Sequence, residues 1–188
     1  ITGYDLVEWQ LLVAAGKKLP VQQQQIQFNG HAIEARLYAE DPYQGFAPQT
    51  GRILYWRPET KLESGQRIDD GISEQGVVSP FYDPMLAKLI VHGIDRDDAI
   101  RRLAKLLAST PLFGLRNNSR FLHDLIQHDA FRHAQMDTAM LDRWLDADEP
   151  IMQVPKASTT AWLLAAAVFA GQPCWRSASV SEFELAMH

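Results

Sequence analysis

The sequence predicts an α+β fold in which an antiparallel sheet is flanked by helices. Short runs of β-forming residues, separated by turn residues, occupy much of residues 31–92. A clear amphipathic helix follows over residues 95–109, and further helical segments come after it. Strands followed by helices favour an antiparallel sheet, or a small barrel, over a parallel sheet built from alternating strands and helices.

The composition is that of a globular chain, with 188 residues of which 46% are hydrophobic and 22% charged. The net charge of −5 argues against a basic nucleic-acid-binding surface, so we expect no nucleic-acid partner. The longest apolar run, residues 161–171, is too short to cross a bilayer, so we expect no membrane partner. The single cysteine, Cys174, allows no intrachain disulfide and fits a reducing compartment. Ile1 stands where an initiator methionine would, so we expect a piece of a longer protein.

The first predicted element is a helix near the N-terminus. Thr2 and Asp5 form a capping-box-like start, and apolar residues then recur at helical spacing. Gly16 and then Pro20 end the helix, because glycine favours the left-handed C-terminal position and proline cannot continue the helical hydrogen bonding.

A predicted hairpin follows. Asn29-Gly30 is a strong turn signal between two β-like runs, Ile26–Phe28 and His31–Glu40. Alternate residues of a strand point to opposite faces, so the second run has a mostly apolar face and a polar face. The apolar face contains His31, Ile33, Ala35, Leu37 and Ala39. The polar face contains Glu34, Arg36, Tyr38 and Glu40. Arg36 therefore stands between two acids, beside a phenol.

The middle of the chain contains further short strands. Three β-like runs alternate with turn residues: Gly51–Trp56, Gln66–Ile68 and Gly76–Val78. The apolar run Met85–Val91 fits a helix or a strand by periodicity, and we favour a strand over Lys88–His92.

The later part of the chain is predicted to be helical. Asp95 caps a helix that runs to about Ser109, with an apolar stripe facing the core. Further helical segments are expected at 119–127, 130–134, 138–145 and 158–170. The composition changes near residue 149, where we place a boundary. We thus predict a domain over 1–149 and, over 150–188, a linker and the beginning of a second domain.

The sequence contains no complete catalytic set. It has no Gly-rich phosphate loop and no Gly-x-Ser-x-Gly nucleophile motif. His123, His128 and His133 recur every five residues, a spacing that does not align them on one helix face. No cysteine or acidic pair joins them at metal-ligand spacing, so we expect no metal site. Cys174 is expected to be a buried, inert thiol.

Three candidate residues remain, each with a structural alternative. Arg36 offers a rigid fork of donors to a small anion, or only balances Glu34 and Glu40. Asp83 is a site acid, or a turn residue before a proline. Lys88 is a functional cation, or a lysine whose stem lies along the sheet while its charge reaches water.

Taken in order, several motifs resemble the C-terminal region of biotin carboxylase, as found in biotin-dependent carboxylases. The matching segments are Ile1–Gln10, Asn29–Pro42, Pro80–Ile90 and the turn Gly114–Asn118. The resemblance covers about residues 1–145 and implies the fold of the biotin carboxylase C-terminal domain. It also implies an ATP-dependent ligase reaction: ATP converts bicarbonate to carboxyphosphate, and a ureido nitrogen of biotin then takes up the carboxyl group.

The resemblance implies roles for three residues. Arg36 matches the catalytic arginine that contacts bicarbonate and the biotin ureido oxygen. A fixed cation there stabilises the negative charge that develops on this oxygen when the ureido nitrogen loses its proton. Asp83, in the loop Phe81-Tyr82-Asp83-Pro84, is a candidate for shaping the same pocket, and Glu34 is a candidate for orienting Arg36.

The resemblance also implies functions that these residues do not supply. Biotin, ATP and Mg²⁺ serve the whole enzyme, whose ATP-grasp region, general-base glutamate and metal-binding acids precede the matched segments. The biotin-attachment signature, a lysine between two methionines, is absent, and the chain ends at Ala186-Met187-His188. We therefore expect no cofactor to be bound by this fragment alone, and neither ATP hydrolysis nor biotin attachment.

Residues after 145 resemble the α-subunits of acyl-CoA carboxylases, of the methylcrotonyl-CoA and geranyl-CoA carboxylase type. This implies three partners: a biotin carboxyl carrier domain, a carboxyltransferase β-subunit and a second biotin carboxylase copy. It also implies a bacterial cytoplasmic or a mitochondrial matrix location. The alternative is a non-catalytic module for dimerisation and β-subunit docking, in which Arg36 is structural.

Overall fold

The computed structural model describes residues 1–170, and its chain divides into two compact units. The first unit is Ile1–Gln153, and the second begins at Val154. Within the second unit the described residues form helix α6, Thr159–Ala170. Cys174 and the chain end at 186–188 lie outside the described residues.

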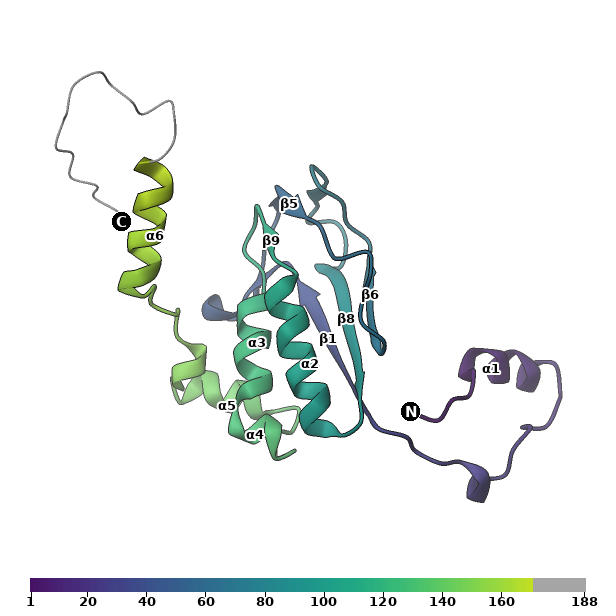
Figure 1. Cartoon of the computed structure of the whole chain (residues 1–188). Coiled ribbons are helices and arrows are strands. Elements are labelled where there is room, and N and C mark those ends of the chain that lie inside the picture. The colour runs from purple at the N-terminus through teal and green to yellow at the C-terminus, as the bar shows by residue number, and fades with distance from the viewer. Residues whose placement is uncertain (171–188) are drawn as a thin grey trace, which may run out of the picture. The chain divides into compact units, whose positions relative to one another are not determined.

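The centre of the first unit is a three-stranded antiparallel sheet with the order β1-β8-β6. Strand β1 is His31–Tyr38, β8 is Met85–Gly93 and β6 is Gln66–Asp70. Helix α2, Arg96–Ser109, lies against β8 and β1, and α3, Ser119–Gln127, contacts α2 and β1 (Figure 1). The predicted α+β fold with an antiparallel sheet and flanking helices is therefore confirmed.

Short elements complete the unit. Three two-stranded pairs are β2 (Glu40–Asp41) with β3 (Ala47–Pro48), β4 (Gly51–Arg52) with β7 (Val77–Val78), and β5 (Tyr55–Trp56) with β9 (Leu112–Phe113). The remaining helices of this unit are α1 (Leu6–Ala14), α4 (Asp129–Arg132), α5 (Met140–Asp146) and the 3₁₀ turns Gln23–Gln25, Pro42–Gln44 and Pro150–Met152. No helix among residues 1–170 is long and apolar enough to cross a membrane.

The core lies between the sheet and α2. Apolar residues pair across the strands on one face, as Ile33 does with Val91 and Ala35 with Leu89. All four are buried, and they join a cluster with the apolar stripe of α2: Ala99, Ile100, Leu103, Leu106 and Leu107. The alternation predicted for 31–40 and the helix predicted for 95–109 account for this layer, because each element presents one apolar face to the other.

Helix α2 begins at a dense polar cap. The Asp95 side chain accepts a hydrogen bond from the Asp98 backbone N–H at 2.8 Å. Asp98 is itself only 4% exposed; its carboxylate accepts from the Ile94 N–H at 3.0 Å and from Arg102 Nε at 2.9 Å. The hydrogen bond from the Ile94 N–H makes the largest contribution to lowering the pKa of Asp98. Arg101 and Arg102 lower it further. Asp95 thus caps the helix, and the ionised Asp98 in its first turn accepts the N–H of Ile94, the residue before the cap.

The predicted hairpin at Asn29-Gly30 is wrong. Ile26–Phe28 forms no strand, and β1 pairs instead with β8, in the register Ala32 with His92. Gly30 has φ +68, and a Cβ there would lie 2.3 Å from the Gly93 carbonyl oxygen. The glycine thus marks a close approach of two chain segments rather than a tight turn between neighbouring strands.

Two other local predictions need correction. The predicted capping box is wrong, since Asp5 itself is the N-cap of α1 and accepts from the Glu8 N–H at 2.9 Å. The predicted strand 51–56 is interrupted: buried Ile53 lies between β4 and β5, and its N–H donates to the Gly76 carbonyl. The strand predicted over Lys88–His92 is confirmed as part of β8.

Candidate functional site

Arg36 lies on the polar face of β1, opposite the core. Its Nε donates to Glu34 Oε1 at 2.8 Å, and the arginine side chain remains 60% exposed. The hydrogen bond to Glu34 makes the largest contribution to raising the pKa of Arg36, and the Tyr38 phenol raises it further. The guanidinium is therefore cationic at any working pH, held by one carboxylate and open to solvent along most of its surface.

The same face carries a row of charges across the three strands. Arg36 pairs in register with Lys88 on β8, which pairs with Asp69 on β6. Lys88 Nζ lies 3.4 Å from Asp69 Oδ2, and Arg67 donates to the two oxygens of Asp69 at 2.6 and 2.7 Å. These contacts lower the pKa of Asp69, and the hydrogen bond from Arg67 makes the largest contribution. Lys88 is thus a charge-paired residue of the central strand.

The outer edge of β1 is covered by one buried side chain at the position of Arg36. Asn118, 6% exposed, donates from Nδ2 to the Arg36 carbonyl oxygen at 3.1 Å. Its Oδ1 accepts from the Tyr38 N–H at 2.8 Å, and its own backbone N–H donates to the Tyr38 carbonyl oxygen at 3.2 Å. Three hydrogen bonds therefore fix the strand from the side opposite β8.

A second anchor holds the end of the same segment. Asp41 is 2% exposed, and its Oδ2 accepts from Arg116 Nη1 at 2.7 Å, while its Oδ1 accepts from the Tyr43 N–H at 3.1 Å. Arg116 and Asn118 belong to one short turn before α3. Together they attach this turn to the segment that begins with Arg36.

The sequence pattern did not reveal these partners, because nothing in the turn Gly114–Asn118 indicates a function. Asn118 stands directly before a helix, a position where asparagine usually caps the helix with its own side chain. Here the side chain makes no cap hydrogen bond and reaches a strand 80 residues away. The only available signal was an asparagine directly before a predicted helix, and that signal does not identify its partner.

Asp83 lies in the turn directly before β8, close to an irregularity in the pairing of β8 with β1. The β1–β8 register shifts between Leu37 and Tyr38, where Leu86 is the extra residue. Asp83 Oδ1 accepts from the Met85 N–H at 2.8 Å, which is the geometry of an Asx turn. The pKa of Glu40 is raised mainly by burial of its carboxyl group. The negative charge of Asp83 raises it further, so the two carboxyl groups are neighbours.

Arg36 and Asp83 line different cavities. Arg36, Glu34, Tyr38 and Asn118 contribute to a cavity of about 330 Å³ along the edge of β1, whose other walls are mostly apolar side chains of α3 and its neighbours. Asp83 lines a separate cavity of about 370 Å³ with Tyr82, near β7. The structure thus brings Glu34 to Arg36, and it places Asp83 in a separate cavity, next to Glu40, which lines the cavity of Arg36.

Among residues 1–170, no group of three His, Cys, Asp or Glu side chains is placed to hold a metal ion. The three histidines that recur every five residues, at 123, 128 and 133, have separate local contacts. His123 Nδ1 lies 3.2 Å from Asp124 Oδ1, the His128 ring packs on Trp144 at a centroid distance of 4.6 Å, and His133 Nδ1 lies 2.9 Å from the Asp129 carbonyl oxygen. None of these contacts brings one of the three histidines to Arg36.

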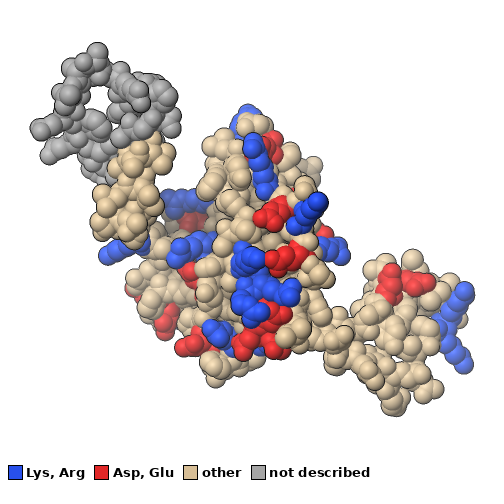
Figure 2. Space-filling model, in the orientation of Figure 1, with Lys and Arg blue, Asp and Glu red and all other residues tan. Residues whose placement is uncertain are grey.

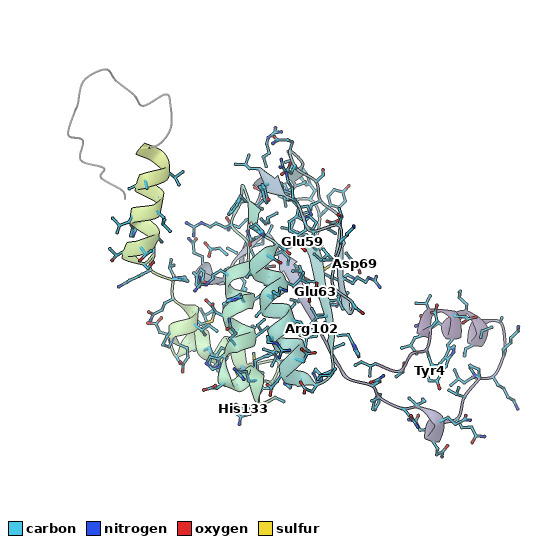
Figure 3. All side chains as sticks on the ribbon, in the orientation of Figure 1. Tyr4, Glu59, Glu63, Asp69, Arg102 and His133 are labelled. Atoms are coloured by element: carbon cyan, nitrogen blue, oxygen red, sulfur yellow. The ribbon has the colours of Figure 1, made fainter. Side chains whose placement is uncertain are left out.

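The surface over α2 carries side chains of both charges. Figure 2 shows acidic and basic side chains mixed there, and contacts explain the mixture: Lys105 Nζ lies 2.5 Å from Glu63 Oε1, and Arg102 pairs with Asp98. In Figure 3, Glu63 and Arg102 lie close together at this face, and Asp69 lies on β6. Interspersed pairs of this kind provide no basic stripe for a nucleic-acid backbone.

Comparison with known proteins adds independent information. The sequence profile of the biotin carboxylase C-terminal domain family matches residues 34–143. The chain is 42% identical over 144 residues to the mitochondrial methylcrotonoyl-CoA carboxylase subunit alpha of Oryza sativa subsp. japonica, covering 77% of this chain and 19% of that protein. It is 46% identical over 146 residues to the biotin carboxylase of Halalkalibacterium halodurans, covering 77% of this chain and 31% of that protein.

Solved structures agree with this. The biotin carboxylase domain of a thermophilic 2-oxoglutarate carboxylase bound to bicarbonate has a TM-score of 0.71 at 32% identity, covering 82% of this chain and 34% of that one. The Kluyveromyces lactis urea carboxylase has a TM-score of 0.65 at 39% identity, covering 76% of this chain and 12% of that one. The chain thus spans only part of each relative, and the profile match includes Arg36, its contacts and the turn before α3. It belongs to the biotin carboxylase C-terminal domain family.

Proposed function

We propose that this chain is the C-terminal part of the biotin carboxylase component of a biotin-dependent acyl-CoA carboxylase. In the complete enzyme, bicarbonate activated by ATP would carboxylate a carrier-bound biotin in a ligase reaction that forms a C–N bond. One observation carries the proposal: the family match includes a strand that presents an exposed, permanently charged arginine, Arg36, from a rigid sheet. Such a group suits a small carboxylate-like anion.

Arg36 is the proposed catalytic residue. Its guanidinium would bind bicarbonate and donate to the ureido oxygen of biotin, where negative charge develops when the ureido nitrogen loses its proton. Glu34 would orient it through the 2.8 Å hydrogen bond to Nε, leaving the other guanidinium nitrogens for the substrate. Asp83 is a second substrate-site candidate. Its Asx turn and its separate cavity support a role in shaping the neighbouring loop.

Biotin, ATP and Mg²⁺ would act in the complete enzyme. The residues that the proposal uses, Arg36 and Glu34, fit the biotin and bicarbonate side of that chemistry, and the family resemblance assigns the ATP-grasp region and its metal-binding acids to segments before the matched ones. We therefore propose that this fragment is inactive alone and binds none of these cofactors by itself. Measurable ATP hydrolysis by the purified 188-residue chain would contradict this.

The proposed partners are a biotin carboxyl carrier domain, a carboxyltransferase β-subunit and a second biotin carboxylase copy. The similarity to the rice methylcrotonoyl-CoA carboxylase subunit supports an α-subunit of the methylcrotonyl-CoA or geranyl-CoA type. We also propose a domain boundary near residue 149, with 150–188 beginning a subunit-linking domain. We propose a bacterial cytoplasmic or a mitochondrial matrix location, and relatives of both origins support this.

The alternative is a non-catalytic module for dimerisation and β-subunit docking. The exposed apolar side chains of α6 favour it: Leu163, Leu164 and Val168 are 66%, 63% and 64% exposed in the described structure. An Arg36→Ala substitution in a complete carboxylase that carries this sequence separates the two. Loss of biotin carboxylation with intact subunit assembly supports catalysis. A rate within about tenfold of the unsubstituted enzyme, or about 1.4 kcal/mol of barrier, contradicts it.

A further inference from the structure

We infer that Asn118 is a positioning residue for Arg36, an inference that rests on the proposed function. The side chain of Asn118 joins the Arg36 carbonyl oxygen and the Tyr38 N–H, at 3.1 and 2.8 Å. It therefore acts on the strand immediately around the arginine, from a turn that precedes α3. No atom of Asn118 needs to touch substrate for this role.

The need for such a residue comes from the place of β1 in the sheet. Strand β1 is an edge strand with β8 on one side only. In an antiparallel ladder, alternate residues direct their N–H and C=O groups to the same side, so Arg36 and Tyr38 expose theirs together along the free edge. An asparagine side chain carries one acceptor and one donor group, and can bond both residues at once.

The side chain of Arg36 cannot fix its own position. It is 60% exposed and its hydrogen bond is to Glu34, two residues away on the same strand and also solvent-exposed. Because Glu34 stands on the same strand, the placement of the pair depends on the backbone of β1. Leu37, 1% exposed, anchors the inner side of the strand in the core, and Asn118 holds the outer side.

The register shift after Leu37 makes this support more important. The extra residue, Leu86, lies in β8, so the bend belongs to the strand that pairs with β1, and the local twist of the pair increases there. The shift falls between Leu37 and Tyr38, one residue beyond Arg36. Asn118 bonds residues on both sides of Leu37, and so it fixes the strand across the start of the irregularity.

The neighbouring asparagine supplies a matched comparison. Asn117 Oδ1 accepts from the Ser119 N–H at 3.1 Å, and its Nδ2 donates to the Leu112 and Leu115 carbonyl oxygens at 3.4 and 3.3 Å. Asn117 therefore serves the start of α3 and its own loop, whereas Asn118 serves β1. One turn thus contains two identical side chains with different tasks.

The test compares Asn118→Asp with Asn117→Asp in a complete carboxylase that carries this sequence. Each substitution keeps the side-chain shape and an acceptor oxygen but replaces the amide donor with an anionic oxygen. At position 118 that oxygen would face the Arg36 carbonyl oxygen and repel it. We expect the KM for bicarbonate to rise about tenfold in Asn118→Asp, the scale of about one lost hydrogen bond. The KM for ATP should stay within about twofold, and Asn117→Asp should change neither constant.

Three outcomes overturn the inference. One is an unchanged bicarbonate KM in Asn118→Asp when Arg36→Lys raises it, which leaves the proposed function standing. Another is an equal rise in the KM for bicarbonate and for ATP, which indicates general destabilisation. The third is an equal rise in bicarbonate KM in both asparagine variants. If Arg36→Lys itself has no effect, the proposed function fails instead. If Asn118→Asp does not fold, Asn118→Ser replaces it, with the same expectations.

Discussion

Replacing Gly30 with alanine tests whether this residue marks a close approach of two chain segments. Gly30 has φ +68, a region that costs an L-residue about 1–2 kcal/mol. Its new Cβ would also lie 2.3 Å from the Gly93 carbonyl oxygen and 2.6 Å from His92 Nε2. Relief of that overlap requires movement of the end of β8, and overpacking of this kind costs about 1–3 kcal/mol. We therefore expect Gly30→Ala to lower the free energy of unfolding by about 2–5 kcal/mol.

Gly45 is the matched control. Its φ of +62 is nearly the same, but a Cβ there would meet no atom within 4 Å. Gly45→Ala should therefore show only the conformational cost, about 1–2 kcal/mol. Urea unfolding of the 188-residue chain, followed by circular dichroism, measures both values. Equal losses in the two variants would refute the reasoning, because they would show that the approach of Gly30 to His92 and Gly93 has no energetic consequence.

Three further predictions concern the stability of the core and the ion pairs. Leu103→Ala should cost about 2–5 kcal/mol, because Leu103 is fully buried between α2 and the sheet; urea unfolding measures this. Arg116→Met should destabilise more than Asp41→Asn, because it leaves the buried Asp41 charge without its cation; a double-mutant cycle of thermal unfolding would show this coupling. The folded-state pKa of Asp98 is lowered, so its stabilising contribution is present above its unfolded pKa and is lost as pH falls through the folded value. Asp98→Asn should accordingly flatten the loss of stability below about pH 4, and an unchanged acid slope would contradict the prediction.

Local patterns predicted the elements that depend on a single periodicity. The alternation in 31–40 identified both faces of β1, and the apolar stripe of 95–109 identified the buried side of α2. Asp95 was correctly expected to cap that helix, since its side chain accepts from the Asp98 N–H. In each case the signal and the structure it predicts lie within a few residues of one another.

Features that depend on distant partners were not predictable in the same way. The Asn29-Gly30 dipeptide has the composition of a hairpin turn, yet its environment is set by His92 and Gly93. The amide of Asn118 bonds a strand that is 80 residues away, which a propensity for helix caps cannot reveal. Arg36 was identified as a candidate from its strand position, but the buried residue that holds its backbone was not.

The contact between Asn118 and β1 also bears on how the protein avoids self-association. A free strand edge displays unpaired N–H and C=O groups that can recruit a strand from another molecule. Three of the four such groups at Arg36 and Tyr38, the Arg36 C=O and both groups of Tyr38, are bonded by Asn118, a buried residue directly before α3. A polar side chain cannot be extended into a further strand, so it ends the ladder of hydrogen bonds there. The residue that keeps Arg36 in place thus also closes this part of the sheet to intermolecular β-pairing.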